Sequence, residues 1–429
     1  MISYRSILEQ PAATSPLMPE WFAQLQADAW KQFQSLPMPK RGAEAWRFST
    51  TSQLEFSDYQ LVDTAVPAEE WIARSSGVKE AAATLVFIND QLVHHESNLP
   101  DGVICLSLSD ALRDCPERVQ PYFMRHPTTL GSAKFSALHA AHLSNGVFLY
   151  VPAGVVVENP VQIFHWANGE NTAILPHTLV VTGAGASVRV IETFQSTDDK
   201  SPSLAIAVND LIAEPNSTLD YVVVQALNHS SKVITINASE VAKQATTTSF
   251  LLSTGANWAR SESISRLIGE EARSNMLAVS TPGWDQEYDL RTFQHHLSPG
   301  AYSDLLYKNS LYDESRTIFS GLIFVDEGAH RTDAYQTCRN LLMSNQAEAN
   351  SMPGLEINAD DVKCSHGSTS CQVSDEEIYY LRARGIHEDR ARQLIARGFS
   401  VEVISRLNHE PTEALILDAL DQKFMALKV

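Results

Sequence analysis

The hydrophobic residues of the chain follow three successive patterns. Over the first part, apolar residues recur every three to four positions and predict a helix over residues 21–33 and another over residues 134–144. A β-type run at residues 84–89 lies between them. From residue 146, short β-type runs separated by Gly, Asn, Asp, Ser and Pro continue for about 200 residues. From residue 374 the helical spacing returns.

The long central region predicts a β-solenoid. A β-sandwich alternates more regularly and stays near about 100 residues, whereas many short strands joined by polar corners suit rungs stacked around one core. No strict repeat length is visible. The expected strands are residues 147–151, 155–157, 161–164, 179–181, 188–191 and 219–224.

The patterns divide the chain into three regions. Residues 1–144 form a mainly helical region with a small strand-containing piece, residues 145–373 form the β core, and residues 374–429 form a C-terminal helical domain. Ser374 and Glu377 make a capping-box pattern that opens this domain. Its many apolar positions either pack on the β core or bind a partner, and the sequence favours neither.

Composition narrows the function classes. The 32 Lys and Arg against 51 Asp and Glu leave a net charge of −19, which argues against binding to nucleic acid or to an anionic membrane surface. The longest apolar stretch, residues 146–157, is shorter than the ~20 residues of a membrane-spanning helix. No secretory signal pattern is visible, and five irregularly spaced cysteines do not form a disulfide framework. We therefore expect a cytoplasmic protein with reduced thiols.

Several catalytic motifs are missing or weak. The sequence holds no Gly-Lys pair and hence no phosphate-binding loop of the ATPase type, and no G-x-S-x-G elbow. The Gly183-x-Gly185 pair is a β-turn pattern, since Val188 replaces the third glycine of a dinucleotide-binding fingerprint. A group of aspartates is interpreted as caps of strand corners, namely Asp285, Asp289, Asp313, Asp326, Asp333, Asp360 and Asp361.

The remaining chemical signal is Cys364-Ser-His366. On a strand, side chains two positions apart share a face, so the Cys364 thiol and the His366 imidazole would lie together. This pair suits iron, zinc or an iron-sulfur cluster. Two ligands cannot complete a four-coordinate site, so Cys338 and Cys371 or a second chain would have to add the others. The alternative is a buried cysteine beside a hydrogen-bonded histidine.

The C-terminal third contains a dense set of motifs, in residues 295–296, 303–304, 307–308, 319–323, 331–336, 340–344, 353–357, 359–369 and 380–386. With these motifs the chain resembles the SufB/SufD family, whose members assemble iron-sulfur clusters. Weaker resemblance extends to residues 145–152 and 44–47. Cys364-Ser-His366-Gly367 favours the SufD type over the SufB type, which tends to carry Glu-His-Glu there.

The resemblance implies a right-handed parallel β-helix between helical regions and a non-catalytic scaffold subunit. Such a subunit pairs with SufB through the β-helix and binds the SufC ATPase through its C-terminal helices, without binding nucleotide itself. His366 and Cys364 would be metal ligands of a nascent iron-sulfur cluster, transient and shared with SufB at the interface. Cys338 and Cys371 are interpreted as structural thiols. A SufB-type scaffold, a polysaccharide-active solenoid enzyme and a free homodimer remain the alternatives.

Overall fold

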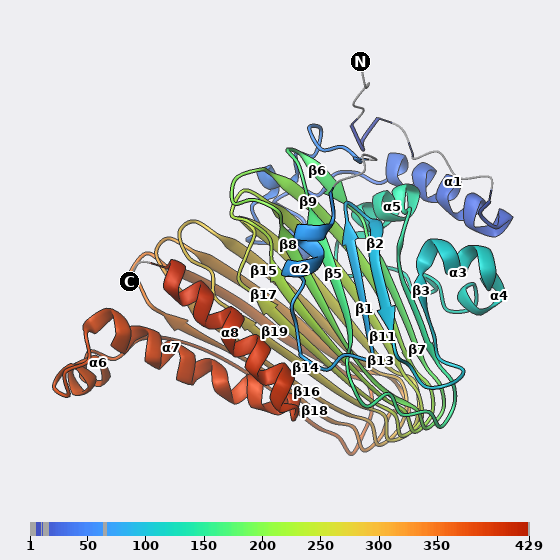
Figure 1. The fold of residues 1–429 in the computed structure, drawn as a ribbon. Helices are drawn as coiled ribbons and strands as arrows, with labels where there is room; N and C mark the ends of the chain where they lie inside the picture. Colours follow the sequence, from blue (N-terminus) through green and yellow to red (C-terminus); the bar gives the residue numbers. More distant parts are fainter. Residues whose placement is uncertain (1–5, 10, 12–16, 63–66, 428–429) are drawn as a thin grey trace.

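The computed structural model describes residues 6–9, 11, 17–62 and 67–427, and its centre is a β-solenoid of about eight turns (Figure 1). Two ten-stranded sheets form its walls. Sheet 1 has the order β2 (Gln91–Ser97), β1 (Ala83–Ile88), β5 (Val161–Ala167), β8 (Ser187–Ser196), β10 (Thr218–Ala226), β12 (Thr246–Ser253), β14 (Arg273–Ser280), β16 (Tyr302–Leu311), β18 (Asp333–Leu342) and β20 (Lys363–Gln372). Sheet 2 has the order β19 (Glu348–Ile357), β17 (Arg316–Val325), β15 (Glu287–His296), β13 (Trp258–Leu267), β11 (Lys232–Val241), β9 (Ser203–Ala213), β7 (His177–Thr182), β4 (Gly146–Val151) and β3 (Ile104–Ser107), and β6 (Thr172–Ile174) pairs with β9.

The helices lie at the two ends of the sequence (Figure 1). The N-terminal set is α1 (Glu20–Ser35), η1 (Glu44–Trp46), η2 (Thr51–Leu54), α2 (Glu69–Arg74), α3 (Leu108–Asp114), α4 (Pro116–Val119) and α5 (Ala133–His142). The C-terminal set is α6 (Asp375–Arg382), α7 (Glu388–Ile404), η3 (Ser405–Leu407) and α8 (Glu410–Ala426). None of the helices in the described ranges is both long and apolar enough to cross a membrane.

The predicted fold class is confirmed, because the strands of each sheet pair in parallel around a shared interior, except for the antiparallel pairs β1–β2 and β3–β4. The strands are buried on both faces near the middle of the stack: in β9, Ala205 and Ala207 face the interior while Ile206 and Val208 face outward. From β4 onward, parallel register partners lie between 26 residues apart, as for Thr235 and Ser261, and 32 residues apart, as for Arg316 and Glu348. This variation explains why no strict repeat is visible in the sequence.

Most predicted elements are present. Helix α1 covers the predicted residues 21–33, α5 lies within residues 134–144 apart from its first residue, and β1 covers most of residues 84–89. The strand expected at residues 155–157 is wrong: Val156 forms only an isolated bridge with Ser187. That segment is a turn between β4 and β5, where Gly154 adopts φ +75°.

Apart from α2, which packs on β1 and β5 of sheet 1, the N-terminal and C-terminal helices cover opposite sheets. Trp46, Phe56 and Phe135 pack with Ile234 and Trp258 against the outer face of sheet 2. On sheet 1, the apolar positions of the C-terminal helices pack on the outward side chains of β10 to β18, and both sets belong to one core cluster. The sequence left open whether the apolar positions of the C-terminal helices pack on the β core or bind a partner. The buried positions pack on sheet 1, and their removal from water stabilises the docked helices.

Helix α8 is docked by a buried lysine as well as by apolar contacts. The Lys423 Nζ donates to Gln286 Oε1 at 2.7 Å and lies 4.4 Å from the centre of the Trp284 ring. Burial lowers the pKa of Lys423 to about 7, partly offset by the Asp313 carboxylate. The hydrogen bond and the aromatic ring therefore stabilise the charged form of a side chain that has little access to water.

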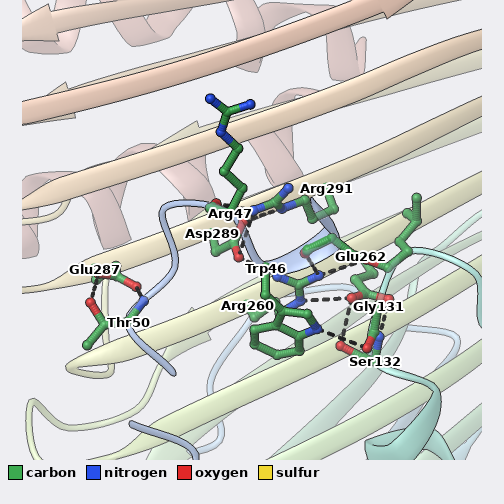
Figure 2. Close-up of polar contacts among 12 residues, drawn as sticks. Trp46, Arg47, Thr50, Gly131, Ser132, Arg260, Glu262, Glu287, Asp289 and Arg291 are labelled. Atoms are coloured by element: carbon green, nitrogen blue, oxygen red, sulfur yellow. Dashed lines mark hydrogen bonds and ion pairs between the residues drawn. The ribbon is translucent and has the colours of Figure 1, made fainter. Parts of the chain in front are cut away.

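A buried ionic network fixes the N-terminal segment on sheet 2 (Figure 2). The Arg260 guanidinium contacts Glu262 at 2.8 Å and also pairs with Asp289, and all three side chains are fully buried. Arg260 also donates to the carbonyls of Ala45 and Leu130, each at 2.8 Å, and its guanidinium lies 3.8 Å from the Trp46 ring centre.

This network corrects one interpretation of the sequence. Asp289 is not a corner cap but the third residue of strand β15, where it also accepts from Arg291 at 2.6 Å. The sequence pattern that indicates this network is the alternation of opposite charges on the two strands. Arg260 and Glu262 on β13 stand in register with Asp289 and Arg291 on β15.

Candidate functional site

The predicted site lies on the last strand of sheet 1. Strand β20 pairs with β18 on one side and has no neighbour on the other among the described residues. Nine of its ten residues are exposed, and Cys364 is half-buried. In sheet 2, β19 occupies the equivalent edge. The C-terminal end of the solenoid thus ends in two open strand edges.

Cys364 and His366 share a face, as expected. They stand in register with Ala334 and Gln336 of β18, which are both buried inside the solenoid. Their side chains therefore continue the interior column of the stack. Strand geometry spaces such i, i+2 positions by about 6.6 Å. The column emerges at the open end, which explains why His366 is exposed although its register partner is buried.

The two side chains have different surroundings. Cys364 packs against the small apolar cluster around Ile323, Val325 and Ala334. Burial, with a contribution from the Asp333 carboxylate, raises the pKa of the Cys364 thiol, which disfavours the thiolate form that binds metals best. His366 is exposed at the end of the stack. The imidazole is therefore the more accessible of the two donors.

Cys338 and Cys371 do not form a common ligand group with Cys364 and His366. Cys338 is fully buried one strand below, with Asn309, Asn340 and Ser351 at 3.7–3.9 Å from its sulfur. Burial raises the pKa of its thiol to about 12. Cys371 stands in register with Leu341, whose side chain packs on the helix-covered outer face. Cys371 therefore faces away from Cys364 and His366.

The described part of the chain holds no group of three or more His, Cys, Asp and Glu side chains placed to bind one metal ion. Cys364 and His366 thus offer two donors to a cluster or iron ion, and the chemistry fits these metals. Completing a four-coordinate site requires donors from a second chain at the open edge.

Two family models together match almost the whole chain. Residues 165–399 match the model described as "SUF system FeS cluster assembly, SufBD core domain", and residues 9–163 match the "SufBD protein N-terminal region". The core match includes β20 and both predicted site residues.

Similar curated proteins agree with these matches. The chain is 27% identical over 422 residues to the iron-sulfur cluster assembly protein SufD of Bacillus subtilis, with 94% of each chain covered. It is 29% identical over 392 residues to SufD of Escherichia coli K12, covering 90% of this chain and 89% of that protein. A SufBD family protein of Staphylococcus saprophyticus is 26% identical over 402 residues, covering 89% and 84%. The alternative of a polysaccharide-active enzyme thus finds no support.

Proposed function

The chain belongs to the SufBD family of iron-sulfur cluster assembly proteins, and from this premise we propose that it is a SufD-type, non-catalytic scaffold subunit. In this proposal it works in the cytoplasm, pairs with SufB through its β-solenoid and binds the SufC ATPase through its C-terminal helices. A nascent iron-sulfur cluster is the cargo, held between the two solenoids by His366 and Cys364 together with donors of SufB.

The observation that carries the proposal is the unprotected edge of β20. Natural sheets block exposed edges with charges, prolines, bulges or very short strands. Strand β20 is ten residues long and contains no proline, Asp, Glu or Arg, and its single Lys, Lys363, stands at its start. A second solenoid could add its own edge strand here, satisfying the free backbone groups and continuing both interior columns.

The backbone register identifies the atoms that such a partner would use. Lys363 N donates to Thr332 O, and Val373 N donates to Leu342 O. In a parallel ladder this places the N–H and C=O groups of odd-numbered β20 residues toward β18. The same groups of the even-numbered residues, including Ser368, therefore point toward the open edge.

Replacing Ser368 with proline tests the pairing. Proline removes one edge-facing N–H while sparing the bonds to β18, so we expect co-purification with SufB to fall by roughly tenfold or more. Ser368→Ala keeps the N–H and is expected to pair normally. Light scattering of the isolated chain also reports whether two copies use this edge. Unchanged SufB binding by the folded proline variant would contradict pairing through β20.

The C-terminal helices leave an exposed aromatic surface on α6. Most apolar residues of α7 and α8 are used against sheet 1, whereas Tyr379 and Tyr380 on α6 are 73% and 57% exposed. Helix α6 projects from the edge of the molecule (Figure 1). Exposed tyrosines are typical of interface anchors, which supports this helix as part of the proposed SufC-binding surface.

The double variant Tyr379→Ala and Tyr380→Ala is expected to weaken SufC binding by roughly tenfold, because two anchor rings are lost. Titration calorimetry with purified SufC measures the effect. Tyr335→Ala removes an exposed tyrosine from β18 and serves as the matched control. Equal SufC affinities of wild type and double variant would place the binding surface elsewhere.

A further inference from the structure

A small basic pocket lies beside the N-terminal segment, away from the β20 edge. Its volume is about 310 Å³, and it is lined by Arg41, Phe48, residues 49–52 and Arg316. Residues 49–52 are all serine or threonine. Neither Asp nor Glu is among the described lining residues. The lining thus consists of two cations, four hydroxyl groups and one aromatic ring.

The charges of the pocket are incompletely neutralised. The Arg316 guanidinium pairs with Glu287 and donates to Thr50 Oγ1 at 2.5 Å, but it retains 26% of its side-chain exposure. Arg41 has no ion pair within the described ranges and is exposed. In a chain of net charge −19, such a local excess of positive charge attracts anions.

A buried hydroxyl provides a second, independent indication of a ligand. Ser49 lines the pocket and is only 2% exposed, yet its Oγ has no hydrogen-bond partner among the described residues. Buried hydroxyls normally have a hydrogen-bond partner from the protein, from ordered water or from a bound molecule. We propose that this pocket binds a phosphate group, with Arg41 and Arg316 balancing its charge and the hydroxyls of Ser49, Thr51 and Ser52 donating to its oxygens.

The first part of the loop that carries these groups is held on both sides of Phe48 (Figure 2). Before Phe48, the Arg47 carbonyl accepts a hydrogen bond from Arg291 at 2.9 Å. After Phe48, Thr50 donates to Glu287 through its backbone N–H at 2.8 Å and its hydroxyl at 2.6 Å. Phe48 between them adopts φ +69°, which is costly for an aromatic residue and persists only where the surroundings impose it. The pocket is therefore preorganised.

Two sources of phosphate fit this chemistry. The volume lies at the lower end of ligand pockets, which start at about 300 Å³, so it takes free phosphate or the phosphate of a small ester. Phe48 is 38% exposed, and the face of its ring that the Arg47 guanidinium does not cover is offered to the aromatic part of an ester for stacking. A nucleoside monophosphate combines both features.

Titration calorimetry of the full chain with inorganic phosphate and with adenosine 5′-monophosphate tests the proposal. We expect saturable binding of at least one probe, weakened roughly tenfold or more by Arg41→Glu because a charge-assisted contact becomes repulsive. Arg41→Lys is expected to retain part of the affinity. If the nucleotide binds more tightly than phosphate and Phe48→Ala removes only that advantage, the site is assigned to an aromatic ester. Equal binding of both assigns it to free phosphate.

Arg273→Glu is the matched control, because Arg273 is an exposed arginine at the start of β14 in the other sheet and its replacement changes the net charge equally. It is expected to bind both probes as wild type does. No saturable binding by the wild-type chain would overturn the proposal. So would equal weakening by Arg41→Glu and Arg273→Glu, since that result reports net charge alone.

Discussion

Replacing Arg260 with leucine is expected to lower the free energy of unfolding by about 3–5 kcal/mol, which is the usual cost of removing one partner from a buried ion pair. The variant leaves the Glu262 and Asp289 carboxylates fully buried without their shared cation. It also removes the hydrogen bonds to the carbonyls of Ala45 and Leu130 that tie the N-terminal segment to sheet 2.

The physical reason is the uncompensated charge rather than the lost attraction. Burial by itself lowers the pKa of the Arg260 guanidinium, but the carboxylates of Asp289 and Glu262 raise it overall, so Arg260 stays charged between them. Without Arg260, Asp289 keeps Arg291, but Glu262 keeps only the hydrogen bonds from Ser132 and has to take up a proton or draw in water. Urea unfolding followed by circular dichroism measures the loss. Proteolysis near residues 40–54 is expected to become faster.

Two further variants separate this cause from general disturbance. Arg113 also contacts two carboxylates, Asp110 and Asp114, each at 2.8 Å, but its side chain is half exposed. Arg113→Leu is therefore expected to leave the unfolding transition nearly unchanged. Adding Glu262→Gln to Arg260→Leu removes the carboxylate that has lost its ion-pair partner, while Asp289 keeps Arg291, and is expected to recover part of the loss. A stable Arg260→Leu single variant would contradict the importance of the network.

Replacing His366 with alanine is expected to reduce cluster formation on the proposed complex by roughly tenfold, since one ligand of an incomplete donor set is lost. The side chain is exposed and forms no hydrogen bond or ion pair with a residue in the described ranges, so the fold and the pairing should persist. The measurement is the iron and sulfide content after anaerobic assembly with SufB, SufC, iron and a sulfur source.

Ser368→Ala is the control for His366→Ala, because Ser368 lies two positions further along the same face of β20. Cys364→Ser is expected to have a smaller effect, since burial already disfavours the Cys364 thiolate. Normal cluster content in an intact His366→Ala complex would exclude His366 as a ligand. Loss of the complex itself would instead indicate a structural role at the edge.

The sequence by itself determined the fold class and the facing of the two predicted donors. Short β runs with polar corners specify stacked rungs, and the strict alternation of strand side chains puts Cys364 and His366 on one face whatever the neighbouring strand is. The capping pattern at Ser374 likewise starts α6, where the Ser374 hydroxyl accepts from the Glu377 N–H. Each of these features depends on residues that are close together in the sequence, so a local sequence pattern predicts it.

Only the tertiary structure decided which strands are neighbours and which stay unpaired. Arg260 meets Asp289 and Arg316 meets Glu287 across 29 residues, but the separation of partners varies along the stack, so no fixed repeat reveals the register. The open edge of β20 and the basic pocket between residues 41–52 and Arg316 depend on the same long-range register. Contacts between distant segments arise from packing of the whole solenoid, and the local sequence does not encode them separately.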